Sequence, residues 1–322
     1  MQATIIAGTK VAAKLGRRDE LMRHASDNLP KHLLQMIELI KTDNRSGAAE
    51  LLERAAAVYA AASTSHPDPT PETAAFIVES ISATLKDAQP GMAGLLNLIR
   101  RVETAIQRPG SISPLGQAAS AASDFAVSAS RNLKAVATKG AELIAPDAVV
   151  LTHSRSSTVV AALLKAAERV QRFSLIATES RPMLEGRQLA EAISAAGVDV
   201  TVIVDAAAAV VMDRVDLVLV GADRVTPGHV LNKIGTRLIA MSARDVGVPI
   251  YCLADTSKFI ANVQPLQQKP DPPSFEVWPH HPANISIINR YFEEVPIEMF
   301  TGIITETGSI APLDAMRLAN RS

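Results

Sequence analysis

The stretch from Gly221 to Lys233 carries the strongest candidates for chemistry. Asp223 follows an apolar run, and Asn232 and Lys233 come nine and ten residues after it. We expect Asn232 and Lys233 to start the next helix, where their donors reach the same ligand as the carboxylate. A carboxylate beside donors can transfer a proton or bind the hydroxyls of a polyol. The alternatives are that Asp223 caps a helix or pairs with Arg224.

Two other polar turns could hold an anion. The sequence Thr-His-Ser-Arg-Ser-Ser-Thr at 152–158 opens a predicted helix, so its backbone amides, its hydroxyls and Arg155 suit a phosphate. Arg181 stands directly before Pro182, which favours an extended backbone suited to clamping an anion. Each turn has an ordinary alternative, a serine-rich helix cap in the first case and a surface loop in the second.

Other reactive residue types give weaker signals. The single cysteine, Cys252, lies inside an apolar run, which indicates a buried, inert thiol. The seven histidines show no metal-ligand spacing, and the chain has neither a dinucleotide-binding glycine motif nor a phosphate-binding loop. We therefore expect no metal and no cofactor.

Composition and charge exclude several classes of protein. The 322 residues include 32 Lys and Arg against 33 Asp and Glu, which argues against a protein that coats nucleic acid. The hydrophobic content of 48% is enough for a large core, so global disorder is excluded. One cysteine cannot build a disulfide framework, and the sequence has no secretory signal or membrane span. These features predict a cytoplasmic protein with no membrane contact and no direct nucleic-acid partner.

The second half of the chain alternates short β-branched runs with helical patterns. Apolar strands are expected at 148–152, 173–178, 198–204, 215–221 and 248–254, with helices near 156–170, 184–196, 205–213 and 230–246. Strands this apolar are buried on both faces, as in a parallel, doubly wound α/β sheet. Ligands of such sheets bind at the carboxyl ends of the strands, where the candidate residues follow.

The first half shows only helical periodicity, punctuated by proline and glycine. We expect an all-helical domain at 1–140 and an α/β domain at 141–322. The proline-rich segment 264–284 is long for a connection, which indicates a functional or interface role. After it, 291–296 and 302–308 are expected to form one last strand region, followed by a short helix.

Four runs carry a resemblance to a known family. They are THSRSSTV at 152–159, TESRPMLEG at 178–186, LVGADRV at 219–225 with NKIGT at 232–236, and GVPIYCLADTSKF at 247–259. They resemble translation initiation factor 2B alpha/beta/delta-type proteins and their enzymatic relatives, methylthioribose-1-phosphate isomerase and ribose-1,5-bisphosphate isomerase. The resemblance covers about 146–318 well. Residues 43–50 are similar to the family's loop before a helix that helps to hold a phosphate.

The resemblance implies a helical N-terminal domain, a Rossmann-like C-terminal domain, a ligand cleft between them and a homodimer formed through the C-terminal domain. The isomerases of the family use a cysteine after the first strand and the aspartate of the GADR motif. Asp223 matches that aspartate, but Ser154 stands at the cysteine position. A serine hydroxyl is a far poorer base than a thiolate, so the sequence is more similar to the non-catalytic members.

We therefore hypothesise that the chain binds a phosphorylated sugar or nucleoside monophosphate, without isomerase activity. The residues expected to hold the ligand are Arg45, Gly47, Ala48, Arg155, Ser156, Arg181, Asn232 and Lys233. One alternative is an aldose–ketose isomerase of a ribose-1-phosphate-type sugar, with Asp223 and Ser154 as the catalytic pair. The other is a structural or regulatory subunit, with translation-factor subunits as partners.

Overall fold

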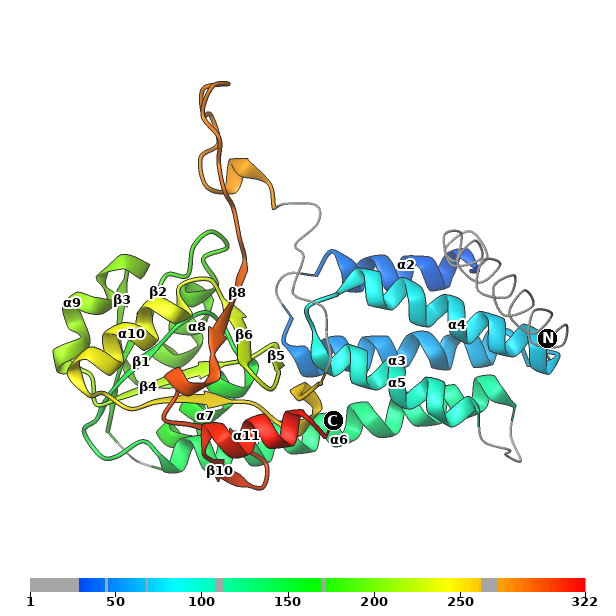
Figure 1. The fold of residues 1–322 in the computed structure, drawn as a ribbon, viewed down its shortest axis with the longest axis horizontal. Coiled ribbons are helices and arrows are strands. Elements are labelled where there is room, and N and C mark those ends of the chain that lie inside the picture. Colours follow the sequence, from blue (N-terminus) through cyan, green and yellow to red (C-terminus); the bar gives the residue numbers. More distant parts are fainter. Residues whose placement is uncertain are drawn as a thin grey trace, which may run out of the picture. The chain divides into compact units, whose positions relative to one another are not determined.

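The computed structural model describes residues 29–43, 46–67, 69–107, 113–169, 172–261 and 272–321. The chain divides into two compact units (Figure 1). One contains 1–44, 50–90 and 98–126, and the other contains 45–49, 91–97 and 127–322.

The first unit is built from helices, as the periodicity of the first half predicts. The helices of this half are α2 (Lys31–Lys41), α3 (Ala48–Ser65), α4 (Pro71–Ala88), α5 (Ala93–Ile106) and α6 (Pro114–Glu142). Helices α3, α5 and α6 each contribute residues to both units. Thr70 caps α4, because its hydroxyl accepts the Thr73 N–H at 3.2 Å and Pro71 occupies the first turn.

The second unit is centred on a seven-stranded sheet of order β10-β9-β7-β4-β1-β2-β3. Its strands are β1 (Val149–Thr152), β2 (Ser174–Thr178), β3 (Asp199–Ile203), β4 (Leu217–Gly221), β7 (Ile250–Leu253), β9 (Gly302–Thr305) and β10 (Gly308–Ile310). All neighbouring strands pair in parallel except β9 and β10. The mixed α/β fold with a mostly parallel sheet is thus confirmed.

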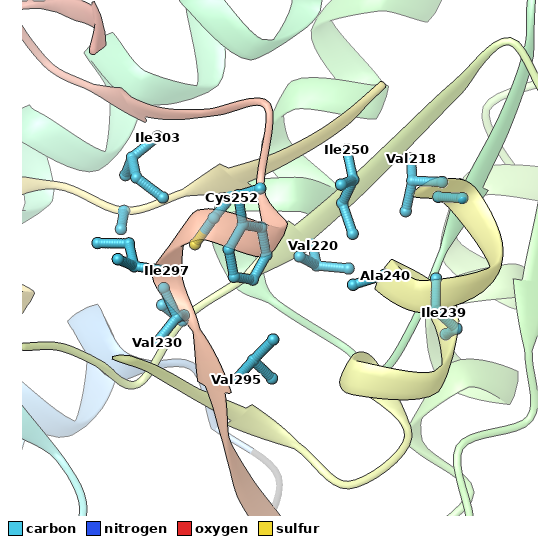
Figure 2. Packing of buried hydrophobic residues seen from close by; sticks show 14 of the residues in the cluster. Val218, Val220, Val230, Ile239, Ala240, Ile250, Cys252, Val295, Ile297 and Ile303 are labelled. Atoms are coloured by element: carbon cyan, nitrogen blue, oxygen red, sulfur yellow. The ribbon is translucent and has the colours of Figure 1, made fainter. Parts of the chain in front are cut away.

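Helices and short 3₁₀ turns connect these strands. The α-helices are α7 (Ser157–Glu168), α8 (Glu185–Ser194), α9 (Ala208–Val211), α10 (Thr236–Val246) and α11 (Pro312–Ala319). The 3₁₀ turns are η2 (Asp205–Ala207), η3 (Met212–Arg214), η4 (Thr256–Lys258), η5 (Ser274–Glu276) and η6 (Ile297–Met299). Apolar residues of the sheet belong to two separate buried clusters. One cluster also includes residues of α10, and the other includes residues of α7 and α8. Figure 2 shows the first cluster, with Val218 and Val220 of β4 beside Ile239 and Ala240 of α10.

Two sequence predictions in this unit are wrong. The helix expected at 230–246 begins only at Thr236, and Asn232 and Lys233 lie in strand β6 (His229–Lys233). Strand β6 pairs with β5 (Arg224–Val225) and with β8 (Phe292–Pro296) in a separate antiparallel sheet. Between β6 and α10, Gly235 has a φ of 104°, a conformation that glycine adopts without strain.

The second error concerns the end of the chain. The single strand region expected at 291–296 and 302–308 falls into two sheets, because β8 joins β6 while β9 joins β7. The turn η6 separates them. Residues 264–271 of the proline-rich segment lie outside the described residues. The following residues, 272–291, form an arm (orange in Figure 1) that leads into β8. No helix in the described ranges is long and apolar enough to cross a membrane.

Candidate functional site

Two serines with unusual backbone angles follow neighbouring strands at the carboxyl edge of the sheet. Ser154 after β1 has a φ of 67°, and Ser180 after β2 has a φ of 65°. The Ser154 N–H donates to Ser180 Oγ at 2.8 Å, and the Ser180 N–H donates to Asp205 Oδ1 at 2.7 Å. Left-handed conformations are uncommon for residues other than glycine and cluster at functional sites. The two turns are therefore locked together at the edge where a ligand is expected.

The start of α7 lies close to two glycines. Ser156 caps this helix, and its hydroxyl accepts the Val159 N–H at 3.4 Å. A Cβ on Gly47 would lie 2.6 Å from Ser157 Cβ, and one on Gly221 would overlap Ser156. Gly47 directly precedes Ala48, the first residue of α3, so the N-terminal ends of α3 and α7 meet here. Helix N-termini present backbone N–H groups that bind anions.

Of the residues predicted to bind phosphate, the structure therefore brings Gly47, Ala48 and Ser156 together. Arg155 lies beside Ser156, is partly buried and has an interaction partner within the structure. Arg45 lies outside the described residues.

A second group of charges lies around Asp223. The Lys233 ammonium is 2.8 Å from Glu185 Oε1, and only 2% of its side chain is exposed. Burial raises the pKa of Asp223, while the positive charges of Lys258 and Lys233 act to lower it and Glu185 acts to raise it. Asp223, Glu185, Lys233 and Lys258 therefore form one electrostatic cluster, which we call the inner cluster.

The hydrogen bonds and ion pairs favour neither alternative for Asp223, although the charge of Arg224 is among those that lower its pKa. Arg224 pairs with Glu294 at 2.8 Å, and residue 223 starts no helix because Arg224 begins strand β5. The backbone of Asp223 is fixed on both sides: its N–H donates to the Leu231 carbonyl at 2.9 Å, and its own carbonyl accepts the Ala93 N–H at 3.2 Å. Its carboxylate thus stays available beside the buried lysines.

Asn232 and Arg181 are engaged differently from the prediction. The Asn232 amide donates to Thr236 Oγ1 at 3.0 Å, so it supports the turn into α10. The Arg181 guanidinium donates to the carbonyls of Glu276 and Val277 at 2.9 and 3.2 Å, which ties it to the arm. The arm is also fixed at its base, because Glu276 accepts the Tyr291 hydroxyl at 2.7 Å.

Cys252 belongs to the core and not to the site. It is fully buried in β7 among apolar residues of the cluster in Figure 2. Burial raises the pKa of its thiol to about 12, so a thiolate is scarce at neutral pH. The prediction that this thiol is buried is confirmed. Among the described residues, no group of three or more His, Cys, Asp or Glu side chains could hold a metal ion.

The sequence of this chain is similar to proteins of a known family. The model of the initiation factor 2 subunit family matches residues 43–312. The chain belongs to this family. A putative translation initiation factor eIF-2B subunit 2-like protein of Pyrococcus horikoshii is 32% identical over 285 residues, which are 88% of this chain and 98% of the relative. A 5-deoxyribose 1-phosphate isomerase of Moorella thermoacetica is 38% identical over 198 residues, 56% of each chain.

Solved structures similar to this chain likewise include both an initiation factor and an isomerase. The crystal structure of a Pyrococcus horikoshii translation initiation factor eIF-2B has a TM-score of 0.77 at 29% identity and covers 89% of this chain and 100% of its own. A 5-methylthioribose 1-phosphate isomerase from the same organism has a TM-score of 0.70 at 25% identity, with 90% and 87% covered. The family thus contains both initiation factor-like proteins and sugar-phosphate isomerases.

Sequence reasoning missed three side chains that the structure of this family member brings to the edge of the sheet: His153, Glu185 and Lys258. Each stands in a run that carries the family resemblance, which is the one signal that could have singled them out. Their spacing in the sequence gives no reason to group them, because the sheet and the turn η4 bring them together.

His153 is a neutral side chain that links the turn after β1 to the end of β2 and to the turn before α10. Its Nε2 lies 2.7 Å from the Ile234 carbonyl oxygen, and its Nδ1 lies 2.6 Å from Thr178 Oγ1. A carbonyl can only accept, so Nε2 carries the proton and Nδ1 accepts from the threonine hydroxyl. Burial is the main cause that lowers the pKa of His153, against the raising effect of the Ile234 carbonyl.

We expect the stability of the protein to fall as the pH drops below about 6.5, partly because of His153. The unfolded histidine takes up a proton there, whereas the buried one resists it, so protons favour unfolding. The contribution is at most about 1.4 kcal/mol for each pH unit. Denaturant unfolding between pH 7.5 and 5.5 should show a shallower loss for His153→Gln than for the exposed control His280→Gln. Equal slopes would contradict this assignment.

Proposed function

We propose that this member of the initiation factor 2 subunit family binds a phosphorylated sugar or nucleoside monophosphate at the carboxyl edge of its sheet, without isomerase activity. The observation that carries this proposal is the meeting of Gly47 with the start of α7. Two helix N-termini lie close together here, with a serine cap on α7 and a glycine without a side chain before α3, and helix N-termini carry backbone N–H groups that bind anions. This arrangement suits a phosphate.

The inner cluster suits the rest of such a ligand. A carboxylate and an ammonium side by side can accept from and donate to the hydroxyls of a sugar. Asp223 and Lys233 would act here, while the arm, which Arg181 holds, would border the site. Asn232 would act indirectly, because its amide supports the turn after Lys233.

The proposal omits isomerase chemistry because, among the described residues, neither Ser154 nor Cys252 is placed to act as the second proton-transfer group that the resemblance implies for the isomerases. Moving a proton from carbon needs a group that removes it and returns it. Ser154 would need activation, but both ring nitrogens of the adjacent His153 are already engaged by Thr178 and Ile234. Cys252, the single thiol, lies in the core.

Calorimetric titration of the full chain with ribose 5-phosphate, ribose 1-phosphate and adenosine monophosphate tests the proposal. We expect binding by at least one of these, with unphosphorylated ribose as the control that binds far more weakly. Gly47→Val should abolish binding, because the added side chain enters the space beside Ser157. Absence of binding by all three at millimolar concentration would overturn the proposal.

Incubation with the bound sugar phosphate in deuterated water separates the proposal from the isomerase alternative. We expect no deuterium at the sugar carbons and no ketose, as followed by NMR. Deuterium uptake that Asp223→Asn abolishes would instead establish the isomerase, with Asp223 as its acid or base. The similarity to proteins named isomerases makes this the favoured alternative.

We further propose a cytoplasmic homodimer formed through the second unit, whose partners include other translation-factor subunits. Large apolar side chains lie exposed on this unit, among them Phe275, Trp278 and Ile288 in the arm and Leu238 on α10. Exposed apolar groups of this kind favour an interface. Light scattering of the purified chain would report a single-chain mass if this is wrong.

A further inference from the structure

The aromatic ring of Tyr291, the last residue of the arm, lies beside Lys233 and has no role yet in the proposed function. The Lys233 ammonium lies over this ring, 5.6 Å from its centroid. The strand pairing explains the contact, because Lys233 of β6 lies opposite Phe292 of β8. The Ile234 N–H then donates to the Tyr291 carbonyl at 2.9 Å. A cation within about 6 Å of a ring is attracted to its face, most strongly where water is excluded.

The ring supports the ammonium without adding a negative charge. The Lys233 side chain is only 2% exposed, and Glu185 Oε1 accepts from its ammonium at 2.8 Å. An ammonium has three N–H donors, so this one bond does not use its full capacity. A further carboxylate in place of the ring would repel those of Asp223 and Glu185. A ring face attracts the cation without a formal charge, so Lys233 keeps its capacity to donate to a ligand oxygen.

The hydroxyl of Tyr291 fixes the ring from its other end. It donates to the carboxylate of Glu276, whose two oxygens both lie at 2.7 Å. The amide of the buried Asn289 donates to the same carboxylate at 2.8 Å and to the Pro273 carbonyl at 2.9 Å. Burial and the Glu276 carboxylate raise the pKa of Tyr291, so the hydroxyl remains a donor at neutral pH. The ring is therefore held in place before any ligand arrives.

Glu276 also connects this network to the turn after β2. Its backbone carbonyl accepts from the Arg181 guanidinium at 2.9 Å, and the Arg181 N–H donates to Asp205 Oδ2 at 2.7 Å. The base of the arm is thus attached at two points of the sheet edge, to the β2 turn through Arg181 and to β6 through Tyr291. A shift of the arm would move the ring and, with it, the support of Lys233.

We propose that Tyr291 is a positioning residue: its ring holds the Lys233 ammonium where it donates to the sugar, and its hydroxyl anchors that ring to the arm through Glu276. This rests on the proposed function and makes it more specific, because the attachment of the arm then sets the affinity for the sugar. The affinity for the phosphate depends instead on the start of α7, where that proposal places it.

Calorimetric titration of the wild-type chain, Tyr291→Phe and Tyr291→Leu tests this proposal, with ribose 5-phosphate and inorganic phosphate as probes. Phe76→Leu removes a half-buried ring from α4 and serves as the control, with wild-type affinity expected for both probes. We expect Tyr291→Leu to weaken ribose 5-phosphate by about fivefold, because the ammonium loses the ring that holds it. Tyr291→Phe keeps the ring but loses its anchor, so it should lie between the two. Inorganic phosphate should bind every variant within about twofold of the wild type.

The recovery in Tyr291→Phe separates a positioning role from a purely structural one. A variant that only loosens the fold would weaken both probes alike, and phenylalanine would not restore what leucine loses. Wild-type affinity for ribose 5-phosphate in Tyr291→Leu, or equal losses for the two probes, would overturn the assignment of Tyr291. Full wild-type affinity in Tyr291→Phe would overturn the part assigned to the anchor on Glu276.

These results are distinct from failure of the proposed function. If the wild-type chain binds neither ribose 5-phosphate nor the other phosphate probes, the proposed function fails and this inference fails with it. If the wild type binds and Tyr291→Leu binds equally well, only the inference fails.

Discussion

Alanine at Gly186 will destabilise the second unit by about 3 kcal/mol, a large effect for one added methyl group. The new Cβ would fall inside the van der Waals radius of the Thr178 carbonyl oxygen and lie 2.9 Å from Ser180 Oγ. The carbonyl cannot withdraw, because Thr178 ends a strand that pairs on both sides and the next residue, Glu179, donates to Ile203. Denaturant unfolding, followed by circular dichroism, measures the loss.

Gly228→Ala is the matched control for this change. Gly228 lies in a turn before β6, where an added Cβ meets nothing within 4 Å and the backbone needs no positive φ. We expect this variant to unfold within about 0.5 kcal/mol of the wild type. Gly186 is the second residue of α8, where alanine alone would favour the helix by up to about 1 kcal/mol. Unchanged or higher stability of Gly186→Ala would therefore show that the Thr178 carbonyl at the end of β2 can move aside without cost.

The strands of the parallel sheet could be predicted because strands buried on both faces consist almost entirely of apolar residues. Each of the five strands expected from β-branched runs lies within its predicted range, with ends shifted by no more than two residues. A strand buried on both faces needs apolar residues at every position, so it differs clearly from the amphipathic helices around it. Polar residues directly after such strands then mark the carboxyl edge.

Strand β6 could not be predicted, because its partner lies far away in the chain. His229–Lys233 is five residues long and pairs with β8, which begins at Phe292. Nothing local distinguishes this run from the start of α10. The antiparallel pairing still brings Lys233 to the inner cluster, where its charge acts on Asp223, although the predicted element is wrong.

The partners of the inner cluster could not be predicted from spacing either. Glu185 belongs to the start of α8 and Lys258 to a turn after β7, and each contributes through its distance from Asp223 in space. Arg181 shows the opposite case. Its type and its proline neighbour suggested an anion clamp, but the carbonyls of the arm occupy its guanidinium. Sequence reasoning identifies the edge of the sheet, whereas the side chains that meet there depend on the tertiary fold.

The second large effect is expected from Lys233→Met, which should cost about 3 kcal/mol at neutral pH. Its partner Glu185 is only 20% exposed, and the other oxygen of that carboxylate, Oε2, is buried without a hydrogen-bond partner. Removal of the ammonium leaves this carboxylate and that of Asp223 with less positive charge nearby. Because the pair is not fully buried, solvent reduces the cost somewhat.

The stability loss caused by Lys233→Met should depend on pH, and its direction can be worked out. Burial raises the pKa of Asp223, and Lys233 is one of the charges that lower it again, so without Lys233 the pKa of this carboxyl in the folded protein rises further above its unfolded value. The deficit is therefore fully present above the folded pKa and shrinks as the pH falls through it. Equilibrium unfolding at several pH values measures this, and a deficit that grows at lower pH would contradict the assignment.

Two further variants separate the buried pair from an ordinary ion pair. Arg187→Met breaks the pair with Glu179, whose 2.7 Å separation is similar but whose arginine is 57% exposed, and should cost about 0.5 kcal/mol. Glu185→Gln combined with Lys233→Met should recover part of the stability, because the double variant no longer leaves the residue 185 side chain as a charged carboxylate without a positive partner. It should not recover binding of ribose 5-phosphate, since the donor beside Asp223 is still missing. Restored binding in the double variant would show that Lys233 acts only by neutralising Glu185.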